Sequence, residues 1–150
     1  MTPEEALAAV RRASESVPRP EMMIRGTCCC DECVEHNQTL LSHTPETITL
    51  KELGNAGWDP ICFASDRAFA YYLPAMVRLA FEDAVYIDQL LFHLNCPGRV
   101  EGLNQEQAAA ARNALWVMVE RAGEDADRFY DERLMEEAIG MLDSADMHNK

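Results

Sequence analysis

Four of the six cysteines lie within one six-residue stretch, which reads Cys28-Cys29-Cys30-Asp31-Glu32-Cys33, and His36 follows three positions later. Such crowding differs from ordinary core packing, in which thiols are spread through the interior. A C-x-x-C step allows two thiolate sulfurs to approach one zinc ion to about 2.3 Å each. The Cys-rich segment 28–36 therefore predicts metal or thiol chemistry.

The spacing of Cys30, Cys33 and His36 restricts how one ion could be bound. Residues three apart on a helix are separated by about 60° around its axis, so positions 30 and 36 diverge by about 120° if all three are helical. If Cys30 lies in the loop just before the helix, it can fold back toward Cys33 and His36, as in zinc knuckles. We expect this second arrangement.

A fourth ligand has to come from another part of the chain, and the sequence leaves several candidates open. Cys62 follows Pro60 in a segment expected to be extended, whereas Cys28 would close the site locally. His93 and Cys96 are further donors, and His43 is a reserve ligand. Four protein donors would make a closed structural site, whereas three donors and a water would leave a catalytic position open.

Redox chemistry is the weaker hypothesis for these cysteines. Asp31 and Glu32 lie between Cys30 and Cys33, and their negative charges oppose formation of a thiolate. The thioredoxin-like βαβ pattern is also missing from the sequence. Taken singly, Cys62 and Cys96 are typical of small buried apolar residues as well as of ligands.

The overall composition is that of an ordinary acidic globular protein. The chain has 150 residues, 48% hydrophobic and 26% charged, with a formal net charge of −13. That length fits one helical domain over 1–150. The negative charge disfavours nucleic-acid binding and is compatible with a basic protein partner. No apolar run is long enough for a membrane span and no signal peptide is visible, so we expect a cytoplasmic protein with reduced thiols.

Periodicity and capping signals predict a mainly α fold. The expected helices cover residues 3–16, 31–42, 67–82, 85–95, 105–122 and a last one from 125 or 127 to about 141. A short turn over 50–53 should end at Gly54, and the tail 143–150 should be frayed. The stretch 58–63 is predicted as a short strand or irregular extended segment near Ile61. The architecture predicted is a compact bundle of about six helices with this one extended piece.

Two features of the middle of the chain bear on this bundle. Pro74 lies inside the helix expected over 67–82 and should bend or split it near Tyr71, because proline removes a backbone donor. The aromatic residues of this region are expected to form core that pins a loop, with an aromatic-lined ligand pocket as the alternative; they are Trp58, Phe63, Phe69, Tyr71 and Tyr72.

Three blocks of residues 25–80 together resemble an uncharacterised bacterial family of small cytoplasmic proteins, a domain of unknown function. The blocks are Cys30-Asp31-Glu32-Cys33-Val34-Glu35-His36, Gly57-Trp58-Asp59-Pro60-Ile61-Cys62-Phe63 and Tyr71-Tyr72-Leu73-Pro74-Ala75. The resemblance implies no reaction. It does place Cys62 in one pattern with Cys30, Cys33 and His36, which favours these four residues over the alternative ligands.

The sequence thus predicts a protein in which Cys30, Cys33, His36 and Cys62 hold a structural zinc ion, and which acts by interaction with a partner. A zinc-dependent, hydrolase-like enzyme with an open coordination position is the alternative, and a thiol-based redox sensor is a third hypothesis. The sequence does not indicate an oligomeric state.

Overall fold

The computed structural model describes residues 1–26, 30–124 and 130–148, and it confirms the mainly α fold. The described residues form seven α-helices and two 3-10 turns, and their only β pairing is an isolated bridge between Ile24 and Ala64. The elements are α1 (Pro3–Ser14), α2 (Asp31–Leu41), α3 (Leu50–Leu53), η1 (Ala56–Trp58), η2 (Pro60–Cys62), α4 (Asp66–Glu82), α5 (Tyr86–Asn95), α6 (Gln105–Glu124) and α7 (Glu132–His148).

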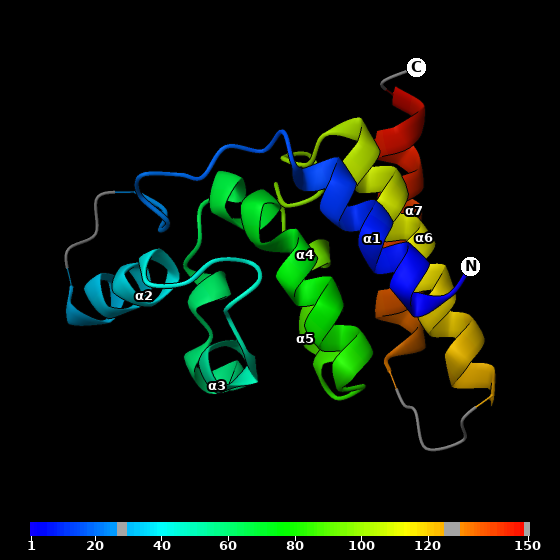
Figure 1. The fold of residues 1–150 in the computed structure, drawn as a ribbon, viewed down its shortest axis with the longest axis horizontal. Helices are drawn as coiled ribbons and strands as arrows, with labels where there is room; N and C mark the ends of the chain where they lie inside the picture. Colours follow the sequence, from blue (N-terminus) through cyan, green and yellow to red (C-terminus); the bar gives the residue numbers. More distant parts are fainter. Residues whose placement is uncertain (27–29, 125–129, 149–150) are drawn as a thin grey trace.

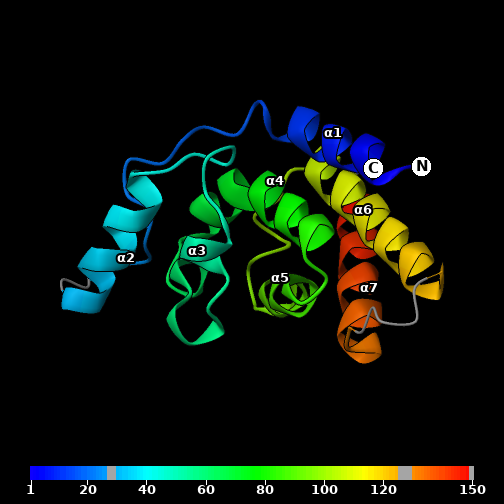
Figure 2. The ribbon, with the colours of Figure 1, turned by 60° about the horizontal axis from the view of Figure 1, so that its bottom comes forward.

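Helix α2 lies at one end of the long axis of the molecule (Figure 1). Helices α1, α6 and α7 pack together at the other end, and α4 and α5 lie between the two ends in both views (Figure 2). Helix α2 contacts the 3-10 turn η2, and so does α3. The chain that follows α1 crosses from one end of the molecule to the other before α2 begins. None of the described helices is both long and apolar enough to cross a lipid bilayer.

Side-chain caps explain why several helices begin where they do. The Thr2 hydroxyl accepts a hydrogen bond from the Glu5 amide (3.1 Å), and the Glu5 carboxylate accepts one from the Thr2 amide (2.8 Å). Ser65 caps α4 by accepting from the Ala68 amide (3.1 Å). Each of these caps contributes about 1 kcal/mol.

Helix α4 continues through Pro74, so of the bend or split predicted near Tyr71 the split is wrong, and the bend stays a prediction. A proline at position 74 cannot donate to the carbonyl of residue 70, four positions earlier. The buried Gln107 side chain of α6 supplies the missing donor, because its Nε2 lies 2.9 Å from the Ala70 oxygen. The same amide group donates to the Ser14 hydroxyl (2.9 Å), which ties α1 to this junction.

The extended segment predicted near Ile61 is also wrong, since residues 56–62 form the two 3-10 turns η1 and η2. Pro60 occupies the first position of η2, where its fixed φ is favourable, and the Asp59 carboxylate accepts a hydrogen bond from the Ile61 amide (2.9 Å). Together these two residues cap a turn instead of starting a strand. The bend returns the chain sharply toward α4.

The C-terminal tail is more ordered than expected, because α7 continues to His148. Arg112 of α6 explains part of this difference. Its guanidinium contacts Asp143 (3.2 Å) and Asp146 (3.0 Å) on successive turns of α7. The prediction that the chain frays from residue 143 is therefore wrong for residues 143–148.

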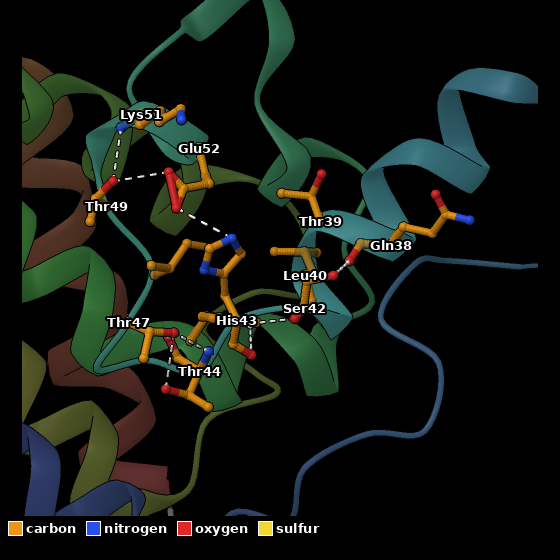
Figure 3. Close-up of polar contacts among 12 residues, drawn as sticks. Gln38, Thr39, Leu40, Ser42, His43, Thr44, Thr47, Thr49, Lys51 and Glu52 are labelled. Atoms are coloured by element: carbon orange, nitrogen blue, oxygen red, sulfur yellow. Dashed lines mark hydrogen bonds and ion pairs between the residues drawn. The ribbon is translucent and has the colours of Figure 1, made fainter.

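Polar contacts fix the connection between α2 and α3 (Figure 3). The Thr47 hydroxyl accepts from the Thr44 amide (2.8 Å), and Glu52 pairs with His43 (3.3 Å). The Tyr72 hydroxyl of α4 reaches the carbonyl oxygens of Leu40 (2.5 Å) and His43 (2.9 Å). The C-terminal end of α2 is thereby anchored to α4.

Candidate metal centre

Asp59, Cys62 and His93 form a group that could hold a metal ion. One ligand atom from each side chain lies within 4.8 Å of the other two. Asp59 and Cys62 come from the turn η2, whereas His93 comes from α5. The group therefore joins segments that are about thirty residues apart in the chain.

The turn that carries Asp59 and Cys62 is held by Arg99, which is 1% exposed. The Arg99 guanidinium donates to the carbonyl oxygens of Ile61 (2.9 Å) and Ala64 (2.8 Å), and it also contacts Asp66 (3.2 Å). Its planar face lies over the Phe69 ring at 5.1 Å. Bonds from a charged donor to main-chain oxygens fix the backbone on both sides of Cys62.

Both carboxylate oxygens of the buried Asp59 side chain are engaged. Oδ1 accepts from the Ile61 amide (2.9 Å), and Oδ2 accepts from Gln89 Nε2 (3.1 Å) and lies 2.6 Å from His93 Nε2. Gln89 itself is oriented by donation to the Leu53 carbonyl oxygen (2.9 Å). Partners of this kind fix the orientation of metal ligands before the ion arrives.

The separation of Asp59 Oδ2 and His93 Nε2 is compatible with a small rearrangement on metal binding. Two ligand atoms at about 2.0–2.1 Å from a tetrahedral ion are about 3.3 Å apart, so the present 2.6 Å contact would lengthen by about 0.7 Å.

Without an ion, the surroundings of the exposed Cys62 side chain disfavour its thiolate form. Burial raises the pKa of the Cys62 thiol, and the nearby Asp59 carboxylate and Cys96 raise it further, although Arg99 acts in the opposite direction. The protonated thiol is therefore favoured, whereas reactive and redox cysteines have depressed pKa values. A bound dication would reverse this preference, because a coordinating thiol is deprotonated outright.

A pocket of about 370 Å³ adjoins the group on its solvent side. Its lining residues are Ala56, Asp59, Cys62, Asp88, Gln89 and Phe92. Because Asp59 and Cys62 line the pocket, a small molecule bound there would contact two of the three candidate ligands.

The Tyr86 hydroxyl is buried and finds no hydrogen-bond partner among the described residues. Burial first, and then the charges of Asp59 and Cys62, hold the pKa of Tyr86 well above its usual value.

The structure places one of the four ligands predicted from the sequence in the Asp59 group and the other three on or beside α2. Cys62 lies in the Asp59 group, together with His93, which the sequence analysis holds only as an alternative donor. Cys30 caps α2, and Cys33 and His36 are buried on the inner face of that helix. That these three share an ion with Cys62 stays a prediction.

The other ligands that the sequence left open are His43, Cys28 and Cys96. His43 is engaged with Glu52, and Cys28 lies outside the described residues. Cys96 is half-buried just beyond α5 and is not a member of the Asp59 group. Sequence reasoning missed Asp59, although an aspartate directly before a proline is a common cap and turn signal that could have directed attention to it.

Comparisons with family models, with curated proteins and with solved structures give no match to this chain. The resemblance to an uncharacterised bacterial family accordingly stays a prediction.

Proposed function

We propose that the protein binds a zinc ion through Asp59, Cys62 and His93, with one coordination position open to the adjoining pocket. The observation that carries this proposal is the convergence of three donors to within 4.8 Å at the edge of a 370 Å³ pocket. Each donor is of a type that zinc accepts, and two of the three side chains are almost fully buried.

The mixture of donors argues for zinc over other common ions. Magnesium and calcium prefer sites made of oxygen ligands alone, so a thiolate and an imidazole disfavour both. Zinc is bound by sulfur, nitrogen and oxygen in tetrahedral geometry. The expected reducing environment keeps Cys62 available as a thiolate ligand.

The pocket argues for an open site over the closed structural site expected from the sequence. A closed tetrahedron needs four protein donors, and no fourth described residue belongs to the group. A water molecule in the open position would be acidified by the ion and could act as a nucleophile, while Gln89 and Asp88 face the same pocket. This arrangement supports metal-assisted hydrolysis of a small molecule as the reaction class.

Calorimetric titration of the metal-free protein with zinc tests the ligand set. We expect Asp59→Asn, Cys62→Ser and His93→Gln each to weaken one binding event by at least about tenfold, the scale on which even supporting partners matter. Cys96→Ser is the matched control, because this thiol is close to the group without belonging to it. Unchanged binding in the three ligand variants, or an equal loss in the control, would overturn the assignment.

Cobalt substitution tests the open position. The absorption spectrum of cobalt in this site should change when a small metal-binding anion such as cyanide or a hydroxamate is added, because the ligand enters the first coordination sphere. The Phe92→Asp substitution, at the pocket wall, should lower the affinity for the added anion while leaving cobalt bound. A spectrum insensitive to such ligands would establish a closed site and refute the proposed hydrolytic role.

A further inference from the structure

His36 is fully buried, yet neither of its ring nitrogens has a hydrogen-bond partner among the described residues. The nearest carboxylate oxygen, from the half-exposed Glu32, lies 3.5 Å from Nε2 and makes no hydrogen bond. An unsatisfied buried polar group costs about 1–3 kcal/mol. Native proteins contain few such groups, and a bound ion that contacts the group is one explanation for those that occur.

Two aromatic rings pack against this imidazole. The Phe63 ring stacks on it with centroids 4.6 Å apart and an interplanar angle of 20°, and the Trp58 ring lies 4.6 Å away at 43°. Contacts of this type would suit phenylalanine equally well and would leave no polar atom unsatisfied. The presence of histidine therefore calls for a ligand at the nitrogen-bearing edge.

That edge is directed toward the first turn of α2. Side chains on a helix lean toward its N-terminus, and the approach of Nε2 to Glu32, one turn earlier, agrees with this direction. Cys33 is buried three positions before His36, so the two share one face of the helix.

Cys30 lies at the same end of α2, but its backbone is not helical. It is the N-cap residue, with an extended backbone conformation, and its Sγ accepts from the Cys33 amide at 3.4 Å. The divergence of about 120° expected for an all-helical segment therefore does not apply to Cys30. The ligand atoms of Cys30, Cys33 and His36 do not all lie within 4.8 Å of one another, so these side chains would rotate toward a bound ion.

We propose that Cys30, Cys33 and His36 bind a second zinc ion, independent of the one proposed at Asp59, Cys62 and His93. Two sulfurs and a nitrogen at the N-terminus of an eleven-residue helix suit a soft divalent cation. The ion would satisfy the buried imidazole and would fasten the first turn of α2 to the aromatic residues of the 58–63 segment.

Native mass spectrometry of the whole protein, purified without added metal and then exchanged into zinc, measures the number of ions per chain. We expect two zinc ions in the parent and one in each of Cys30→Ser and His36→Phe. The Cys62→Ser variant should also hold one ion, at the other site. Cys30→Ser is the mildest of these changes, because that side chain is exposed and its loss leaves the core intact.

The pattern of losses separates the two proposals. A single ion that persists in His36→Phe and disappears in Cys62→Ser would refute the second site and leave the first. A single ion with the reverse behaviour would refute the first site and leave the second. If His36→Phe retains both ions and is more stable than the parent, His36 is an ordinary core residue and the present inference is wrong.

Tryptophan fluorescence gives a second readout that does not depend on counting ions. In a Trp116→Phe background, Trp58 is the remaining tryptophan, and it lies against the His36 ring. Zinc should then change the emission of the Cys62→Ser variant, in which only the second site is intact. The same addition should leave the emission of a His36→Phe, Cys62→Ser double variant unchanged; an equal response in both would contradict the proposal.

Discussion

Asp59 Oδ2 and His93 Nε2 lie 2.6 Å apart in the interior, although 34 residues separate them in the chain. Their side chains are 2% and 1% exposed. The contact joins the turn η2 to helix α5, and it places a carboxylate and an imidazole beside Cys62. The same pair therefore contributes to the fold of the metal-free protein and would supply two of the proposed ligands.

Removal of one partner from this pair should destabilise the metal-free protein strongly. We expect Asp59→Leu to lower the free energy of unfolding in chelator by about 3 kcal/mol, because it leaves a buried imidazole and the Gln89 amide without their acceptor. Urea denaturation followed by circular dichroism measures this loss. Glu137→Leu, in the exposed pair with Arg133, is the control and should change stability by less than about 1 kcal/mol. Similar effects of the two substitutions would contradict the structural role of Asp59.

Arg99 should control both stability and the geometry of the metal centre. The Arg99→Met substitution removes the donors to the Ile61 and Ala64 carbonyl oxygens, and we expect a loss of about 3 kcal/mol together with weaker zinc binding at Cys62. Arg67→Met, on the exposed side of α4, is the matched control. Calorimetric titration with zinc and urea denaturation measure the two effects. Loss of stability with unchanged zinc affinity would show that the turn keeps its shape without Arg99.

The helices of this protein could be predicted from local signals, because their caps and apolar periodicity lie within a few residues of each end. Thr2 with Glu5 locates the start of α1, and Ser65 locates the start of α4 to within one residue of the predicted position 67. The predicted extended segment near Ile61 failed for a related reason. Asp59 and Pro60 are a local cap and a first-turn proline, and the prediction gave more weight to the apolar residues around them.

The candidate site could be predicted only in part, because its contacts are long-range. His93 and Cys62 were recognised as possible ligands from their residue types, but nothing local indicates that α5 packs against the turn η2. Asp59 was missed because nothing in its local sequence, an aspartate before a proline, distinguishes a metal ligand from a turn residue. Similarly, the continuity of α4 through Pro74 depends on Gln107, a residue 37 positions away from the carbonyl that it satisfies.

Ionisation of Tyr72 should make the protein unstable at alkaline pH. Burial is the main reason that the pKa of Tyr72 is raised to about 12 in the folded protein from 10.0, while Arg19 partly opposes the shift. The folded state therefore favours the neutral phenol. Its contribution to stability is complete below pH 10 and is lost as the pH rises from 10 toward 12.

Comparison with Tyr72→Phe isolates this contribution. At pH 8 the variant should be less stable by about 1–2 kcal/mol, because the hydrogen bonds to the Leu40 and His43 carbonyl oxygens are lost. Between pH 10 and 12 its stability should fall less steeply than that of the parent. Urea denaturation at several pH values gives both slopes, and parallel slopes would show that Tyr72 does not ionise in this range.

Gln107 and Pro74 should be energetically coupled through the Ala70 carbonyl oxygen. Gln107→Met removes the donor that replaces the missing proline amide, and we expect a loss of about 1–3 kcal/mol from the unsatisfied buried carbonyl. Pro74→Ala restores an amide at position 74, so it should recover about 1 kcal/mol more in the Gln107→Met background than in the parent. A double-mutant cycle from urea denaturation measures this difference directly. Strictly additive effects would mean that the Ala70 carbonyl is satisfied by another donor, and that Gln107 stabilises the fold through its contact with the Ser14 hydroxyl instead.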